Sequence, residues 1–113
     1  MGELASKKCV PCQGGIPPLA QEEAQKYLRM VSGWALMEDS SKIRKQFEFG
    51  SFADAMKFVN AVAGLTEAEG HHPEMLISFR KVVFTLYTNK IHGLHENDFI
   101  LASKIDGLFA ELH

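Results

Sequence analysis

Residues 51–88, SFADAMKFVNAVAGLTEAEGHHPEMLISFRKVVFTLYT, decide the fold of this protein. Ser51 followed by Asp54 is typical of a helix start, and apolar side chains then recur on one helical stripe. Gly70 offers a place for the chain to leave the helix, and Pro73 disfavours helical geometry at the residue before it. The stretch therefore predicts a long helix, to about residue 69, that ends just before two consecutive histidines.

On the C-terminal side of this helix the pattern changes to that of β-strands. Segments 75–81 and 82–88 are rich in β-branched and aromatic residues, with side chains of alternating character. From about Glu96, apolar residues recur at helical spacing and acidic residues lie in the first turn. We expect a pair of strands followed by a last amphipathic helix.

The N-terminal side predicts a similar unit. Segment 21–30 carries apolar residues at helical spacing, and segments 34–39 and 42–49 predict a hairpin with one polar face. The order α-β-β-α-β-β-α predicts an α+β fold, a two-layer sandwich of a four-stranded antiparallel sheet with three helices on one face. Because the edges of such a sheet are free to pair, we expect a homodimer or a homotetramer.

Length and composition describe one compact domain. The chain has 113 residues, of which 46% are hydrophobic and 23% charged, enough to bury a single core. We expect this domain over residues 19–113, after a flexible N-terminal arm over residues 1–18. The 12 basic and 14 acidic residues are spread along the chain, which disfavours nucleic acid as a partner.

The sequence also argues against a membrane partner. No apolar run approaches the ~18 residues of a spanning helix, and no apolar stretch follows the first basic residues as in a secretory signal. We therefore expect a cytoplasmic protein. Residues 1–6, MGELAS, formally fit an N-myristoylation pattern, but short patterns often match by chance and one acyl chain holds a membrane only marginally.

The only cysteines are Cys9 and Cys12, in a segment rich in glycine and proline. A lone CxxC lacks the four ligands of a structural zinc site, and the βαβ context of a thioredoxin-like motif is absent. A plain mobile segment is the simpler interpretation. A zinc site that combines these thiols with histidines stays open as an alternative, and its candidate ligands are His71, His72, His92 and His95.

The histidine pair is the strongest candidate for chemistry. Histidine can both donate and accept a proton near neutral pH. Helix carbonyls favour an imidazolium at a helix end, whereas a second imidazolium beside the first is disfavoured, so His71 and His72 could form an acid and a base. Glu67 would share a helical face with His71, and its carboxylate could orient one of the two rings. The alternative is that both histidines are surface residues that cap the helix.

A resemblance that covers nearly all of the chain after the arm favours the chemical interpretation. The sequence resembles the pterin-4a-carbinolamine dehydratase family, whose signature is an acidic residue, His-His-Pro, an aromatic residue, a further histidine at a strand end and a later aspartate. The matching positions are Glu67, His71-His72-Pro73, Phe79, Thr88-Asn89 and Asp98. The Cys-Val-Pro-Cys arm, Trp34 and the Phe47-Glu48-Phe49 segment also fit.

The resemblance implies that a 4a-hydroxytetrahydropterin loses water to give the quinonoid dihydropterin, in the recycling of a tetrahydrobiopterin-type cofactor. It implies a small-molecule pterin as the partner, and neither a metal nor an organic cofactor. The implied catalytic residues are His71, His72 and Glu67. The implied substrate-binding residues are Pro73, Phe79, Thr88, Asn89 and Asp98.

One departure from the signature weakens the enzymatic hypothesis. Asn89 stands where the family has histidine and sometimes tryptophan, and an amide cannot deliver a proton. His92 and His95 lie near enough in sequence to compensate, although His95 is more readily explained as the cap of the last helix. A catalytically weak member that acts as a protein-binding or dimerisation scaffold, like the coactivator-type animal relatives, is the alternative function.

Overall fold

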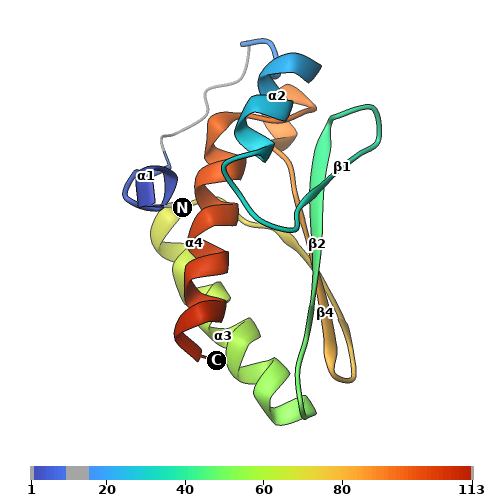
Figure 1. Ribbon diagram of the computed structural model, residues 1–113, viewed down its shortest axis with the longest axis vertical. Helices are drawn as coiled ribbons and strands as arrows, with labels where there is room; N and C mark the ends of the chain where they lie inside the picture. The colour runs from blue at the N-terminus through green and yellow to red at the C-terminus, as the bar shows by residue number, and fades with distance from the viewer. Residues whose placement is uncertain (1, 10–15, 113) are drawn as a thin grey trace.

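The computed structural model describes residues 2–9 and 16–112, and the described part is an α+β sandwich (Figure 1). The predicted order of three helices and four strands is confirmed. The elements are α1 Gly2–Ala5, α2 Gln21–Leu28, β1 Ala35–Met37, β2 Lys42–Glu48, α3 Phe52–Glu69, β3 Glu74–Ser78, β4 Lys81–Leu86, the short 3-10 helix Asn89–Ile91 and α4 Glu96–Leu112. The one-turn α1 and the 3-10 helix were not predicted.

The four strands form one antiparallel sheet in the order β1-β2-β4-β3, so β1 and β3 are its edges. Facing pairs of β2 and β4 such as Phe47 with Val82 and Ile43 with Leu86 are buried, whereas Arg44 on the opposite face is exposed. Figure 1 shows the helices gathered on one side of this sheet. The alternation along the strands therefore puts the core between the sheet and the helices.

The core is built around α3 and α4. Ser51 Oγ accepts the Asp54 amide at 3.1 Å, which starts α3 at the predicted place. Phe58 of α3 is fully buried, and its ring centroid lies 5.1 Å from that of Phe47 on β2 and 5.7 Å from that of Phe84 on β4. Such aromatic contacts stabilise a core beyond the area they bury.

A buried polar contact connects β1 and β2 to α4. The indole Nε1–H of Trp34 donates to the two carboxylate oxygens of Asp106 at 3.1 and 3.2 Å, and Lys45 Nζ lies 2.8 Å from Oδ1. The carboxylate of Asp106 is thereby compensated although it is buried. The contact fixes the N-terminal hairpin against the helix that carries the candidate site.

The boundary between β3 and β4 differs from the sequence prediction. The strands were expected over 75–81 and 82–88, but β3 ends at Ser78 and β4 begins at Lys81. Phe79, expected inside the first strand, lies in the turn with φ of 54° and is 68% exposed. Pairing of Ser78 with Lys81 leaves two residues to reverse the chain, and a tight turn of this kind needs a positive φ.

Described residues of the N-terminal arm lie against α4 rather than apart from the domain. α1 runs beside α4 in Figure 1, and Leu4 is 1% exposed. Lys7 Nζ is 2.6 Å from Glu96 Oε2 at the start of α4. The expectation of a flexible arm did not foresee this packing. Cys12 lies outside the described residues.

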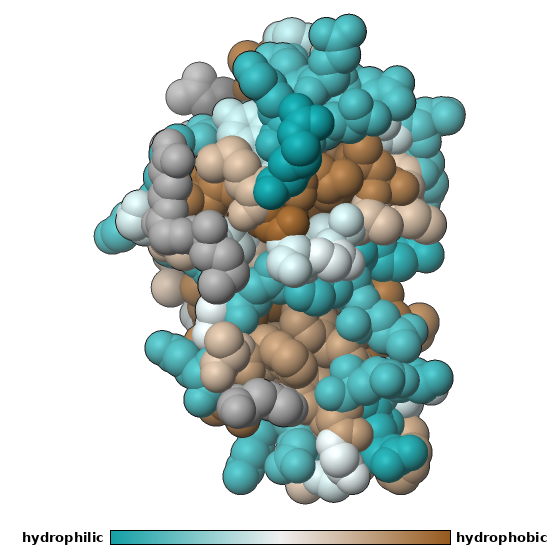
Figure 2. Space-filling model, in the orientation of Figure 1, coloured by the Kyte–Doolittle hydropathy of each residue, from teal (hydrophilic) through white to brown (hydrophobic). Residues whose placement is uncertain are grey.

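The surface carries a mixture of polar and apolar side chains. In the view of Figure 2, apolar surface is seen where α2 and β1 lie in Figure 1, and hydrophilic residues surround it. Within the described residues, no helix has both the length and the apolar character needed to cross a bilayer.

Candidate active site

The histidine pair lies where α3 ends, as predicted. Gly70 closes the helix in the left-handed conformation with φ of 68°, and its amide and that of His71 both donate to the carbonyl of Thr66. A glycine is favoured here because other residues are strained at this φ. The chain then runs through Pro73 into β3, so the two histidines occupy a short extended connection between a helix and a sheet edge.

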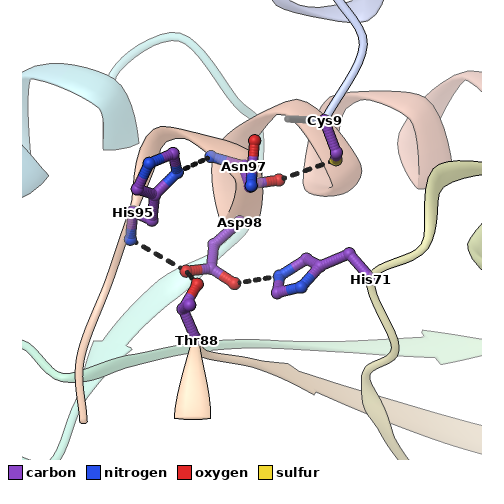
Figure 3. A network of polar contacts seen from close by, with 6 residues as sticks. All are labelled: Cys9, His71, Thr88, His95, Asn97 and Asp98. Atoms are coloured by element: carbon purple, nitrogen blue, oxygen red, sulfur yellow. Dashed lines mark hydrogen bonds and ion pairs between the residues drawn. The ribbon is translucent and has the colours of Figure 1, made fainter. Parts of the chain in front are cut away.

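Asp98 is the centre of the polar network around this connection (Figure 3). Its Oδ1 lies 2.6 Å from Nε2 of His71, and its Oδ2 accepts the Thr88 hydroxyl and the His95 amide, each at 2.9 Å. The side chain of Asp98 is fully buried. Three hydrogen bonds from three segments therefore compensate one buried carboxylate.

The start of α4 holds Asp98 in place. The amide of Asn97 donates to His95 Nδ1 at 2.9 Å, and the amide of His95 donates to Asp98 Oδ2, which is the reciprocal arrangement of a capping box. Because Nδ1 accepts, the proton of the neutral His95 ring lies on Nε2. His95 is thus the cap of α4, the simpler of the two roles considered for it.

Glu67 contacts one ring of the pair, as expected, but the ring is not that of His71, with which it was expected to share a helical face. Its Oε1 lies 2.6 Å from Nε2 of His72 instead. The helical spacing that would bring Glu67 to His71 is broken at Gly70, because the left-handed residue turns the chain away before His71. Each histidine consequently has its own carboxylate: that of His71 is buried, and that of His72 is 77% exposed.

The chain after β4 supplies the opposite wall. Thr88 pairs with Gly93 across a small loop, which contains the 3-10 helix Asn89–Ile91. Asn89 begins this helix and is exposed. His92 ends it in a left-handed conformation with φ of 53° and is exposed. A positive φ at a non-glycine residue is uncommon and reflects the tight closure of the loop.

A cavity of about 500 Å³ lies between these walls, within the usual range for a small-molecule site. Five of the predicted residues line it: His71, His72, Pro73, Thr88 and Asn89. Glu67 and Asp98 act on the histidines from outside the lining, and Phe79 is in the distant hairpin turn. The remaining lining residues are Cys9, Glu69, Gly70, Glu74, Tyr87, Lys90 and Asn97.

Comparison with known proteins identifies the family. The sequence profile described as Pterin 4 alpha carbinolamine dehydratase matches residues 17–108. The chain belongs to this family. A relative from Methylococcus capsulatus that bears the pterin-4-alpha-carbinolamine dehydratase name is 49% identical over 108 residues, covering 96% of this chain and 95% of the relative. A relative of the same name from Halorhodospira halophila is 47% identical and covers 95% of this chain and 98% of its own.

Solved structures agree with this assignment. The crystal structure of a transcriptional coactivator/pterin dehydratase from Brucella melitensis has a TM-score of 0.77 at 30% identity, over 80% of this chain and 97% of that chain. A pterin dehydratase-like protein that is a RuBisCO assembly factor in the alpha-carboxysome has a TM-score of 0.59 at 28% identity, over 67% and 88%. As a pterin-4a-carbinolamine dehydratase, the chain falls among the hydro-lyases, and the expected enzyme class is confirmed.

The dehydratase signature has a histidine at the position of Asn89, and neither His92 nor His95 replaces it in this chain. His95 is engaged at the start of α4, and His92 is not among the residues that line the cavity. Lys90, the residue after Asn89, does line it. The lining of this dehydratase cavity therefore includes a carboxamide and an amino group besides the histidine pair.

Cys9 lines the dehydratase cavity, and the sequence analysis did not foresee this. Its amide donates to Glu69 Oε1 at 2.8 Å, and its thiol donates to the Asn97 carbonyl at 3.6 Å. Burial, followed by the negative charge of Glu69, raises the pKa of Cys9 to about 12. The side chain is therefore a neutral thiol. No local pattern signals this position, because its contacts come from residues at least 60 positions away.

The zinc alternative receives no support from the described residues, in which no group of three or more histidine, cysteine or acidic side chains is placed to hold a metal ion. Cys9 lines the cavity, but His95 accepts a hydrogen bond at the start of α4 and His92 is exposed outside the cavity lining. Cys12, the other thiol of that hypothesis, is outside the described residues.

The raised pKa of Cys9 predicts a pH dependence of stability. Above an ordinary thiol pKa of 9.0 the unfolded chain loses this proton, whereas the folded chain keeps it up to about 12. The unfolded state then binds fewer protons, so the free energy of unfolding falls as pH rises above about 9. When the free energy of unfolding is measured by urea titration from pH 8 to 10, it should fall more steeply with pH for the wild type than for Cys9→Ser. Parallel curves would contradict the buried neutral thiol.

Proposed function

We propose that this protein removes water from a 4a-hydroxytetrahydropterin by proton transfer through His71 and His72, and so returns the quinonoid dihydropterin to cofactor recycling. The observation that carries the proposal is a pair of adjacent histidines in the wall of a cavity, each bonded to a carboxylate of its own. Family membership supports the substrate class. The reaction breaks the bond from C4a to the hydroxyl oxygen and removes a proton from the neighbouring ring nitrogen.

His71 acts as the base in this proposal. Because ionised Asp98 accepts at Nε2, the neutral ring carries its proton there and leaves Nδ1 free to accept. The side chain of His71 is 14% exposed, and the buried carboxylate fixes its orientation. A base that is held in one tautomer and one rotamer needs no rearrangement before it accepts the proton of the ring nitrogen.

His72 acts as the acid. Its side chain is 60% exposed, so the cationic ring remains hydrated while Glu67 contacts Nε2. Nδ1 of the imidazolium can then protonate the leaving hydroxyl, which departs as water. The ring recovers a proton from solvent, and His71 returns its proton to solvent. One proton enters and one leaves in each turnover, and no redox partner is needed.

Asn89 and Lys90 hold the substrate in this scheme. An amide both donates and accepts, which suits the donor and acceptor edges of a pterin ring, but it does not titrate. Thr88 and Pro73 form the rest of the contact surface. The acid function then rests on His72 alone, and we expect a slower enzyme than one with a histidine in place of Asn89.

We infer that the protein works as a homodimer or a homotetramer. β3 is an edge strand. Its residue Leu76 is 65% exposed, and Phe79 in the turn that follows β3 is 68% exposed. Exposed apolar residues at a free strand edge favour pairing with a second chain. Phe79 would then lie at a subunit boundary, and its predicted contact with pterin would have to come from a neighbouring subunit.

A protein-binding role is the second candidate function. The solved structures related to this chain include one described as a transcriptional coactivator/pterin dehydratase and one described as a RuBisCO assembly factor. The replacement of a proton-donating residue by Asn89 favours this role over fast catalysis. A chain that forms stable hetero-complexes but does not accelerate pterin dehydration would support it.

Replacing either histidine should abolish most of the acceleration. A stopped-flow assay with 4a-hydroxytetrahydropterin should show kcat/KM lowered by ~10²–10⁴-fold in His71→Ala and in His72→Ala, the range of a well-placed acid or base. His92→Ala, an exposed histidine outside the cavity lining, is the matched control and should retain wild-type activity. A wild type that is no faster than the spontaneous reaction would refute the proposed function.

Restoring a histidine at position 89 should raise the rate. We expect Asn89→His to increase kcat by about ten-fold, because a second proton donor would face the leaving group. Asn89→Gln keeps a carboxamide that cannot titrate and should show no such gain. Equal rates in the two variants, in the same stopped-flow assay, would show that the lack of a proton donor at position 89 does not limit turnover.

Asp98 should affect turnover more than binding, since it touches His71 and not the cavity. We expect Asp98→Asn to lower kcat by about ten-fold or more, because the charge that orients the base is lost, with little change in KM. Thr88→Ser keeps the hydroxyl that donates to Asp98 and should stay near wild type. A rise in KM at unchanged kcat would instead assign Asp98 to substrate binding.

A further inference from the structure

The wall of the cavity includes a residue that lies N-terminal to the residues matched by the family profile. The match begins at residue 17, but Cys9 lies in the lining together with His71 and Asn97. We propose that residues 2–9 complete the pterin site, and that Cys9 is a binding residue that contacts the substrate. This inference rests on the proposed function, because it takes the ligand of the cavity to be a pterin.

The first anchor of this segment is apolar. Leu4 is 1% exposed and belongs to the main hydrophobic core, and α1 lies beside α4 (Figure 1). Burial of an apolar side chain stabilises the attachment of this segment. An ion pair between Lys7 and Glu96 adds a second point of attachment, at the first residue of α4. The segment is thereby aligned with the helix that carries Asp98.

The third anchor is Glu69, the last residue of α3. Its Oε1 accepts the Cys9 amide at 2.8 Å, and its Oε2 lies 3.5 Å from Lys104 Nζ on α4. Burial opposes ionisation, but the Cys9 amide and the Lys104 charge outweigh it and hold the pKa of Glu69 below its usual value. Because Glu69 precedes Gly70 and His71, the same residue places the arm and the start of the histidine connection.

The thiol itself is suited to contact rather than to reaction. Its donor atom is directed to the Asn97 carbonyl in Figure 3, and the raised pKa keeps it neutral. A neutral thiol behaves as a small, polarisable apolar group. In a cavity of about 500 Å³ whose other lining residues are mostly polar, it supplies an apolar packing contact for the flat pterin ring.

Enlarging this side chain tests the contact. Cys9→Phe places a ring in the cavity, and Lys8→Phe places the same ring at the neighbouring exposed residue, outside the lining. We expect Cys9→Phe to raise KM, and to weaken binding of a stable dihydropterin that cannot lose water, by about ten-fold or more. Lys8→Phe should stay within about two-fold of wild type. Unchanged binding in Cys9→Phe would overturn the proposal.

Releasing the arm tests it without filling the cavity. Leu4→Asp should detach residues 2–9, seen as loss of hydrogen-exchange protection at the Cys9 amide, and should raise KM with kcat little changed. Detachment without a change in KM or in dihydropterin binding would refute the inference. The binding measurement separates this inference from the proposed function, since a chain that binds dihydropterin through Cys9 but does not catalyse dehydration refutes only the latter.

Discussion

The carboxylate of Asp98 is the contact on which the site depends. It is fully buried and accepts hydrogen bonds from a histidine after α3, a threonine after β4 and a backbone amide before α4. Burying an ionised group is costly unless such donors compensate it. The three connections that make up the cavity must therefore meet at this one point for the carboxylate to be stable.

The arrangement explains how a small domain holds the ring of His71 in a fixed orientation. The ends of α3 and β4 and the start of α4 are each set by packing of the core, in which Phe58 and Phe84 are fully buried. The site lies where these elements end, so the core that stabilises the fold also sets the distance between the histidine pair and Asn89. His72 differs from its neighbour because its carboxylate partner belongs to an exposed turn of α3.

Several site residues could be predicted because their signals are local. The His-His-Pro sequence after a glycine marks a helix exit in any context, and the family resemblance supplied Glu67, Thr88, Asn89 and Asp98. Their partners could not be predicted in the same way. Helical spacing predicted that Glu67 would share a face with His71. Because Gly70 is left-handed, the chain turns there and Glu67 contacts His72 instead. Phe79 was predicted to lie in a strand, but it lies in the hairpin turn and does not line the cavity.

The sequence by itself determined the order of helices and strands, the family and the candidate acid and base, because periodicity and motifs are carried by neighbouring residues. Only the tertiary structure decided that Asp98 orients His71, that His95 caps α4 and that Cys9 reaches the cavity. These contacts join residues from separate connections or from the arm, and their strength comes from burial in a shared low-dielectric interior. Burial of this kind is a property of the assembled fold and has no local pattern.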